Sequence, residues 1–278
     1  MNRLSLAPVT VNDLGPLDLI AAAHTAGFDS TDLRVLGAPG AASVAPLIGE
    51  KPLIAAIAGA LADTGLTLYA ATGIWLLPDF DLDSCLPALE VAAQLGVEKF
   101  LAVGNDPDEA RMTANLGRLA DAARSFNLGL ALELMPYTAV NSLPKAHRMI
   151  RACDRSNLGL LIDALHLARA GGIPAEVAAI PAKDIAYLQL CDAPKLLPAG
   201  LELRAESLGS RLYPGDGALP LFDLMDSLPA NIVIDVETPV ARNNQLSGVI
   251  RATLAFSATQ RFVAAWKAQK SIQTIGTK

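Results

Sequence analysis

The sequence predicts an α/β fold, a single (β/α)8 barrel that occupies residues 1–278 as one domain. Short apolar segments rich in Leu, Val and Ile recur about eight times, and longer segments with apolar residues at three- and four-residue spacing separate them. Strands that alternate with helices in this way pair in parallel through right-handed crossovers. Eight such units in 278 residues are typical of a closed barrel. A doubly wound open sheet is the alternative, because periodicity alone does not show closure.

The expected strands are short segments rich in Leu, Val and Ile. The expected strands are RLSLAPV (3–9), STDLRVL (30–36), LTLYAAT (66–72), EKFLAVG (98–104), LGLALEL (128–134), LGLLIDA (158–164), IAYLQLC (185–191) and IVIDVET (232–238).

Helices are expected between the strands, for example over residues 86–95 and 110–126, where the apolar spacing is helical. A helix commonly ends at a residue in the left-handed conformation, which favours Gly and Asn. Four such residues stand between a helical pattern and the next strand: Gly27, Gly65, Gly96 and Asn127.

Composition and charge argue against several classes of protein. The net charge of -6 and a pI near 5.1 disfavour a nucleic-acid partner, because affinity for phosphate comes from Lys and Arg. The start MNRLSLAPVT has no signal-peptide pattern, and the longest uncharged apolar stretch, 53–62, is too short to span a bilayer. Three separated cysteines, Cys85, Cys153 and Cys191, form no CxxC pair. We therefore expect a cytoplasmic protein without a membrane partner, in which Cys191 is a buried side chain rather than a nucleophile.

One connection is longer than the others. Residues 192–219 contain APKLLPAG and RLYPGDG and show no strong helix or strand pattern. A loop of this length in a compact domain is usually functional. Its segment 195–210, with Arg204 and Glu206, is expected to line the pocket or a subunit contact.

Polar residues close four successive strands of the second half. In a barrel, catalytic groups come from the C-terminal ends of the strands. Glu133, Asp163, Gln189 and Glu237 occupy those ends. An isolated acid at a strand end is more often an ion-pair or capping residue, but four in register predict a shared site. A divalent cation would make three buried carboxylates tolerable. Asp235 is the alternative to Glu237, because it lies on the same face of the strand.

The motifs ALELMP, DALHLARAGG, YLQLCDAP, RLYPGDGALPL and DVETP follow one another between residues 128 and 239. In this order they resemble the sugar isomerase/epimerase superfamily with the xylose isomerase-like barrel. Within that superfamily the resemblance is to the hydroxypyruvate isomerase and ketose 3-epimerase branches. Residues before 128 resemble the superfamily only in the alternation of expected strands and helices.

The resemblance implies that Glu133, Asp163, Gln189 and Glu237 bind one divalent metal ion. Many relatives have histidine where this chain has Gln189, and the hydroxypyruvate isomerase branch shares the departure. A ligand set made of oxygen favours Mn2+ or Mg2+, with Co2+ or Zn2+ as alternatives.

The resemblance assigns His166 and Arg211 to the substrate. His166 would reach a substrate hydroxyl or carbonyl oxygen, and the guanidinium of Arg211 would contact a carboxylate or adjacent hydroxyls. The alternatives are a histidine bound to a backbone carbonyl and a solvated loop arginine. Trp75 and Tyr137 are expected in the pocket wall, with a place in the core as the alternative.

The implied reaction is the isomerisation or epimerisation of a small polyhydroxy or hydroxy-keto substrate. It would proceed by proton abstraction and a metal-bound enediolate, with Glu133 and Glu237 as acid and base. A dehydratase acting on inosose or dehydroshikimate is the alternative, and a non-catalytic metal- or ligand-binding protein is less favoured. Abasic-site endonuclease activity would need more histidines than the three present. Exposed apolar helix faces would allow a homodimer.

Overall fold

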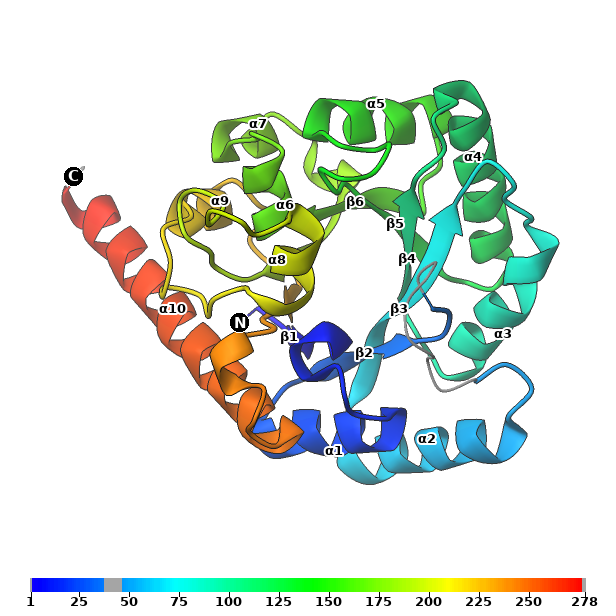
Figure 1. The fold of residues 1–278 in the computed structure, drawn as a ribbon, viewed down its shortest axis with the longest axis horizontal. Helices are drawn as coiled ribbons and strands as arrows, with labels where there is room; N and C mark the ends of the chain where they lie inside the picture. The colour runs from blue at the N-terminus through cyan, green and yellow to red at the C-terminus, as the bar shows by residue number, and fades with distance from the viewer. Residues whose placement is uncertain (1, 38–46, 277–278) are drawn as a thin grey trace.

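The chain folds into a closed barrel of parallel strands surrounded by helices (Figure 1). A computed structural model describes residues 2–37 and 47–276. Within them the strands follow their order along the chain, and the last strand pairs with the first, so the predicted (β/α)8 barrel is confirmed and the open sheet is wrong. The strands are β1 (Leu4–Leu6), β2 (Ser30–Arg34), β3 (Thr67–Leu76), β4 (Lys99–Gly104), β5 (Gly129–Glu133), β6 (Leu158–Asp163), β7 (Ile185–Leu190) and β8 (Ile234–Val236).

The helices lie outside the strands and cover the barrel (Figure 1). None of those among the described residues is both long enough and apolar enough to cross a membrane. The α-helices are α1 (Pro16–Ala26), α2 (Lys51–Thr64), α3 (Leu86–Gln94), α4 (Glu109–Ser125), α5 (Leu143–Cys153), α6 (Ala164–Arg169), α7 (Pro174–Ala178), α8 (Leu203–Gly209), α9 (Leu221–Asp226) and α10 (Gly248–Gly276). Short 3-10 helices are η1 (Pro8–Val11), η2 (Asp83–Cys85), η3 (Ala182–Asp184) and η4 (Ala241–Asn243).

The predicted helix ends carry the left-handed residues that the sequence placed there. Gly27, Gly65 and Gly96 have φ values of 96°, 72° and 72°, and Asn127 has φ 60°. A residue other than Gly or Asn would be strained at these angles. These four positions therefore help to fix where each helix stops and the next strand begins.

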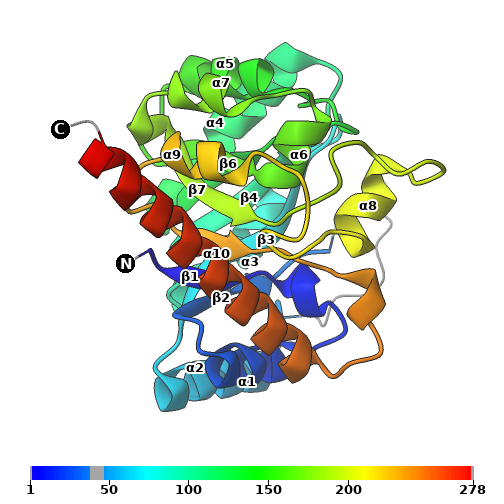
Figure 2. The ribbon, with the colours of Figure 1, turned by 90° about the vertical axis from the view of Figure 1, so that its left-hand side faces the viewer.

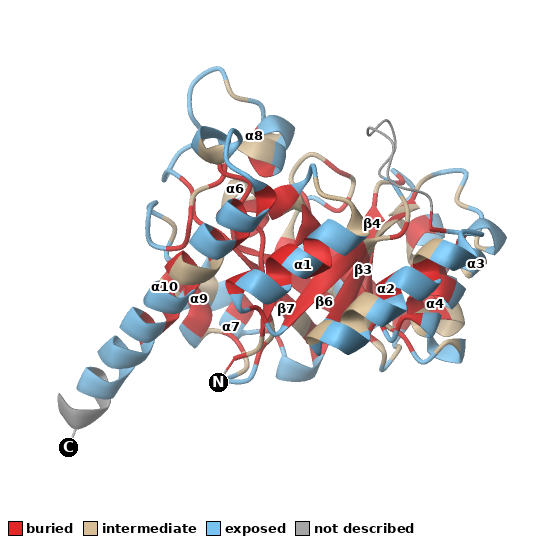
Figure 3. Ribbon diagram, turned by 90° about the horizontal axis from the view of Figure 1, so that it is seen from below, coloured by how far each residue is buried: buried red, intermediate tan, exposed pale blue. Residues whose placement is uncertain are grey.

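Apolar side chains fill both sides of the strand layer. The larger cluster packs between the strands and the helices, and a second cluster lies inside the barrel. In that inner cluster the rings of Tyr69 and Tyr187 meet edge to face with their centroids 5.2 Å apart. Figure 3 shows the buried strands enclosed by helices whose outer faces are exposed. Because side chains fill the barrel interior, a ligand has room only at an end of the barrel.

The register of the strands brings the polar strand ends to one level. Asp163 of β6 is paired with Gln189 of β7, and Gln189 with Asp235 of β8. The helix α8 stands over this end of the barrel, on the side away from the N-terminus (Figures 2 and 3). It lies in the 192–219 connection, where the sequence predicted no strong element.

Candidate active site

A cavity of about 510 Å³ opens at the C-terminal ends of the strands. Its volume suits a small-molecule ligand. Asp163 lies directly beneath it, with no exposed surface. Five of the six predicted site residues line the cavity: Glu133, His166, Gln189, Arg211 and Glu237. A second, more open cavity of about 570 Å³ lies beside α10 and is lined by none of the six.

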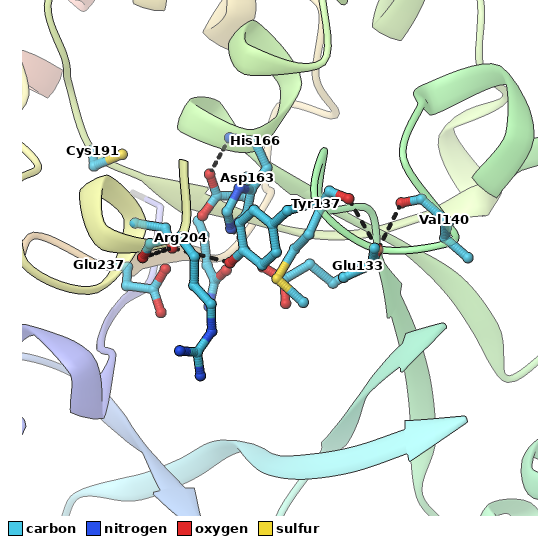
Figure 4. Close-up of polar contacts among 12 residues, drawn as sticks. Glu133, Tyr137, Val140, Asp163, His166, Cys191, Arg204 and Glu237 are labelled. Atoms are coloured by element: carbon cyan, nitrogen blue, oxygen red, sulfur yellow. Dashed lines mark hydrogen bonds and ion pairs between the residues drawn. The ribbon is translucent and has the colours of Figure 1, made fainter. Parts of the chain in front are cut away.

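The spacing between Asp163 and His166 has a local structural cause. Asp163 ends β6 and is the N-cap of α6, where its Oδ1 accepts a hydrogen bond of 2.8 Å from the backbone N–H of His166. Asp is favoured at this position because its side chain satisfies a free N–H of the first helical turn. The cap holds His166 over the end of the barrel, with its Nε2 3.8 Å from Oε1 of Glu133 (Figure 4).

Glu133, Asp163 and His166 form a buried group whose ligand atoms all lie within 4.8 Å of one another. Such a group could hold a divalent cation through two carboxylates and an imidazole. Burial lowers the pKa of His166 to about 4, so its imidazole is neutral and offers a lone pair. The roles of Glu133, Asp163, Gln189 and Glu237 as metal ligands, and of His166 and Arg211 at the substrate, remain predictions.

Arg211 joins two of the predicted metal ligands. Its side chain is 2% exposed, and its Nη1 and Nη2 each lie 2.6 Å from a carboxylate oxygen, Oδ2 of Asp163 and Oε2 of Glu237. The Nε donates to the carbonyl of Ser207 at 2.9 Å, and Nη1 donates to Sγ of Cys191 at 3.3 Å. Cys191 is buried, as predicted. The guanidinium fork therefore balances the charge of two buried acids that come from different strands.

The three carboxyls differ in how easily they ionise. Burial raises the pKa of Glu133 well above its usual range, and the nearby Glu237 and Asp163 raise it further. Burial also raises the pKa of Glu237, to about 7, although Arg211 opposes the shift. Burial acts on Asp163 as well, but Arg211 and His166 outweigh it and hold its pKa below the usual value. The three carboxyls of one site thus differ in their affinity for a proton.

The amide of Gln189 is held in one orientation. Its Nε2 donates to Oδ2 of Asp235 at 3.1 Å, and its Oε1 is buried without a hydrogen-bond partner among the described residues. A buried acceptor without a donor is costly, and a bound cation would satisfy it. Together with the carboxylates of Glu133 and Asp163, this oxygen fits the predicted divalent metal ion.

Asp235 faces the inside of the barrel, where it meets Asp32 of β2. Burial raises the pKa of both carboxyls, that of Asp32 to about 7, and the two side chains can share a proton. Oδ1 of Asp32 also accepts hydrogen bonds from Oγ of Ser5 at 2.9 Å and from the N–H of Ala70 at 3.1 Å. Through the hydrogen bond from Nε2 of Gln189 to Oδ2 of Asp235, this pair orients the amide of Gln189.

The opposite wall of the cavity comes from β3, β4 and the segment after β5. It is largely apolar and includes Trp75 and Tyr137, so both expected wall residues line the pocket. The hydroxyl of Tyr137 lies 3.0 Å from Oγ of Ser207, and its ring meets that of His166 edge to face at 5.6 Å (Figure 4).

The segment 195–210 lines the cavity, which is one of its two expected roles. Arg204, Ser207 and Leu208 of this segment face the pocket. The helix α8 is fixed by a buried ion pair in which Nε and Nη2 of Arg169 each lie 2.7 Å from a carboxylate oxygen of Glu206. This bidentate contact between α6 and α8 gives the cavity wall a defined position.

The glycines of RLYPGDG shape the chain that follows Arg211. Oδ2 of Asp192 accepts hydrogen bonds from the N–H groups of Gly215 and Gly217, at 3.0 and 2.9 Å. A Cβ at Gly217 would lie 2.3 Å from Oδ1 of Asp192, so this position requires glycine. Asp192 thereby anchors the loop that begins at Arg211, a role that the sequence analysis missed.

Arg34 is the second residue that sequence reasoning missed. It ends β2 and lines the cavity beside Glu237. The signal was present, because Arg34 is the last polar residue of the apolar segment STDLRVL. The rule that identified Glu133 and Asp163 identifies Arg34 as well when it is applied to the first half of the chain.

Comparison with known proteins gives one family and several relatives. The model of the xylose isomerase-like TIM barrel family matches residues 20–260. A 3-dehydroshikimate dehydratase of Pseudomonas aeruginosa is 29% identical over 138 residues, which are 48% of this chain and 21% of that protein. An inosose isomerase of Bacillus licheniformis is 27% identical over 143 residues, 48% of this chain and 50% of that protein. The matches therefore span half or less of these curated relatives.

Solved structures share the fold over nearly the whole chain. The IOLI protein, solved with a zinc atom, superposes with a TM-score of 0.77 at 18% identity and covers 95% of this chain and 99% of that one. An L-ribulose 3-epimerase superposes with a TM-score of 0.73 at 15% identity and covers 98% of both chains. At these identities the likeness shows the fold alone.

Proposed function

Because the chain belongs to the xylose isomerase-like TIM barrel family, we propose that it is a divalent-metal-dependent isomerase or epimerase of a small hydroxy-carbonyl compound. One observation carries the proposal. Glu133, Asp163 and His166 form a buried group that could hold a metal, on the floor of a cavity of about 510 Å³ that Glu237 and Arg211 also line. The similarity to a protein named inosose isomerase supports the same class of reaction.

Glu237 and Glu133 would exchange the proton. The bound cation would act as a Lewis acid that increases the acidity of the C–H next to the substrate carbonyl. Glu237 has a pKa near 7 and an Oε1 that Arg211 does not hold, so this oxygen would take the proton. Glu133, which ends β5 at the other end of the row of acids, would return a proton to the neighbouring carbon.

His166 and Arg211 would orient the reacting groups. The neutral imidazole of His166 can hydrogen-bond to a substrate oxygen, and its backbone is fixed by Asp163. Arg211 would hold Oε2 of Glu237, so that the other oxygen of this carboxylate faces the cavity. Oxygen ligands from Glu133, Asp163, Gln189 and Glu237 favour Mn2+ or Mg2+, whereas a His166 nitrogen in the ligand set would favour Zn2+ or Co2+.

A dehydratase is the second candidate, and the similarity to 3-dehydroshikimate dehydratase supports it. Glu237 would abstract the same proton, and the substrate would then lose its β-hydroxyl as water after protonation by Glu133. The two candidates share a base and differ in the product.

We place the enzyme in the cytoplasm, because its cysteines are free and buried.

The test is turnover in D2O by metal-loaded protein, followed by NMR. Mn2+- and Mg2+-loaded samples should be offered ketoses, hydroxypyruvate and cyclic polyhydroxy ketones, with metal-stripped protein as the control. The proposal expects deuterium at the carbon next to the carbonyl, in an isomer or an epimer. Loss of water with deuterium incorporation would instead support the dehydratase. Turnover without any exchange, or equal turnover after metal removal, would contradict the proton-transfer mechanism.

A further inference from the structure

Two arginines that line the cavity form no ion pair with a carboxylate of the described residues. Arg34 closes β2, and Arg204 lies in α8 on the cavity wall (Figure 4). Among residues 2–37 and 47–276, neither guanidinium has an ion pair or a hydrogen bond. Arg211, the third arginine of this cavity, holds two carboxylates. The contrast indicates that Arg34 and Arg204 are not needed to balance the acids of the site.

Arg34 is the more unusual of the two. Its side chain is half-buried, and burial lowers the pKa of Arg34 although Glu237 lies near enough to oppose the shift. Removing part of a guanidinium from water without a partner costs free energy. Arg34 stands two residues after Asp32 on the same strand face, and both line the cavity. Its charge is therefore directed at the space where a ligand would lie.

The acids near the cavity are already balanced. Arg211 and a divalent cation would together neutralise Glu133, Asp163 and Glu237. The carboxyl of Asp32 already has partners inside the barrel, where it accepts hydrogen bonds from Ser5 and Ala70 and faces Asp235. With the metal in place, half-buried Arg34 and exposed Arg204 would face no further acid among the described residues that line the cavity.

We infer that the substrate carries a carboxylate, which Arg34 and Arg204 bind at the cavity wall. This inference rests on the proposed function and narrows it to hydroxy-keto acids. The planar guanidinium fork matches a carboxylate with two parallel hydrogen bonds. The ion pair between Arg169 and Glu206 fixes α8, so Arg204 is presented by a preformed wall.

The rest of the wall suits a compact carbon skeleton. Trp75, Leu101, Val103 and Met135 line the cavity and offer an apolar surface to the C–H face of a ring. An open-chain sugar would bring hydroxyls against this surface and leave them without partners. A cyclic hydroxy-keto acid therefore fits both walls.

The test compares two ligands that differ by one charge, 3-dehydroshikimate and its methyl ester. Calorimetry on the Mn2+-loaded protein should find the acid bound at least about tenfold more tightly, as expected for charge-assisted hydrogen bonds. Arg34→Gln and Arg204→Gln should each bring this ratio toward one without weakening the ester. Arg34→Lys keeps the charge and should restore part of the ratio. Arg148→Gln removes an exposed arginine of α5 that pairs with Glu109 of α4, and it should leave the ratio unchanged.

Each alternative outcome overturns the inference. Equal binding of acid and ester, a preference that survives in both glutamine variants, or binding of neither ligand would each contradict a carboxylate site. Preference for a ketose phosphate over the acid would replace the carboxylate with a phosphate. The proposed function is judged separately, because deuterium exchange in a neutral ketose does not require Arg34 or Arg204. Thermal unfolding of each variant near the wild-type midpoint confirms that the fold is intact.

Discussion

The two halves of the barrel contribute different things to the same cavity. The ends of β5 to β8 supply the acids and the amide, Glu133, Asp163, Gln189 and Glu237, and Arg211 joins two of them. The ends of β1 to β4 supply a largely apolar wall and Arg34. Under the proposed function, the second half would carry the reacting groups, and the first half would recognise the shape and charge of the ligand.

The halves differ also in how strongly their residues depend on one another. Arg211 bonds to Asp163, and Asp163 also caps α6 and so places His166. In the first half, Trp75 and Arg34 each face the cavity on their own. Substitutions in the second half should therefore cost more than substitutions in the first.

The largest effect is expected for Arg211→Met. The change leaves Asp163 and Glu237 buried without their shared cation, and breaking a buried ion pair costs roughly 3–5 kcal/mol. Urea unfolding of metal-free protein measures the loss, and adding Mn2+ should recover part of it because the ion replaces the missing charge. Arg148→Met, at an exposed pair, is the control. An unchanged unfolding midpoint would show that the Arg211 contacts contribute nothing.

Next in size is the effect of Glu133→Gln on turnover. The variant should lose at least about a hundredfold in kcat, the lower end of what a positioned acid or base contributes, and Glu237→Gln should behave alike. Asp163→Asn should instead lose chiefly metal, because Asp163 is assigned to the metal and not to the proton. Elemental analysis of the samples used for kinetics separates the two effects. Loss of metal in proportion to activity in Glu133→Gln would remove its role as an acid.

Asp32→Asn tests the contact that joins the halves inside the barrel. Burial raises the folded-state pKa of Asp32 to about 7, above its ordinary 3.8. In its protonated form the Asp32 side chain therefore contributes to the stability of the folded protein at low pH. That contribution to the free energy of unfolding is lost as the pH rises toward about 7. Asparagine can keep the bonds to Ser5 and Ala70 and donate permanently to Asp235. The variant should melt above the wild type at pH 8, with the difference shrinking toward pH 5. A difference independent of pH would show that Asp32 does not titrate in this range.

Gln189→His should change the choice of metal. An imidazole nitrogen in place of an amide oxygen favours Co2+ and Zn2+ over Mg2+, and a shift of about tenfold in relative affinity is in the range seen when a metal site is altered. Competition between the ions, followed by elemental analysis, measures the ranking. A ranking equal to that of the wild type would place Gln189 outside the metal site.

The smallest effect is expected in the first half. Trp75→Leu removes part of the apolar wall and should raise KM severalfold while kcat changes little, because the lost contact stabilises bound substrate and transition state alike. Steady-state kinetics on the metal-loaded enzyme measures both. A fall in kcat as large as that of Glu133→Gln would erase the distinction between the halves.

The sequence predicted elements with a repeated local signal. All eight strands were found because apolar segments alternate with helical spacing, and Gly27 or Asn127 marks a helix end by its own backbone preference. The helix α8 was missed because its stability comes from a tertiary contact, the ion pair of Glu206 with Arg169. Local pattern carries no trace of such a partner.

Strand ends and family motifs predicted which residues belong to the candidate site but not which of them contact one another. Those motifs drew attention to Glu133, Asp163, Gln189 and Glu237, and all of them meet at one end of the barrel. That Arg211 would bond to Asp163, 48 positions earlier, cannot be read from spacing. Arg34 is a single residue at a strand end. Its interpretation depends on its having no ion-pair or hydrogen-bond partner among residues 2–37 and 47–276, which only the structure shows.

Because the barrel closes through its last strand, a newly synthesised chain can complete its fold and its cavity only after that strand has been made. The register that pairs Leu4 with Ile234 joins the first strand to the last, and Glu237 follows that last strand directly. Until β8 has left the ribosome, β1 has an unpaired edge and Arg211 has only one of its two carboxylates. A nascent chain without β8 therefore exposes strand edges that other chains can pair with. Pairing of β8 with β1 therefore removes the exposed strand edges and brings Glu237 to the cavity at the same time.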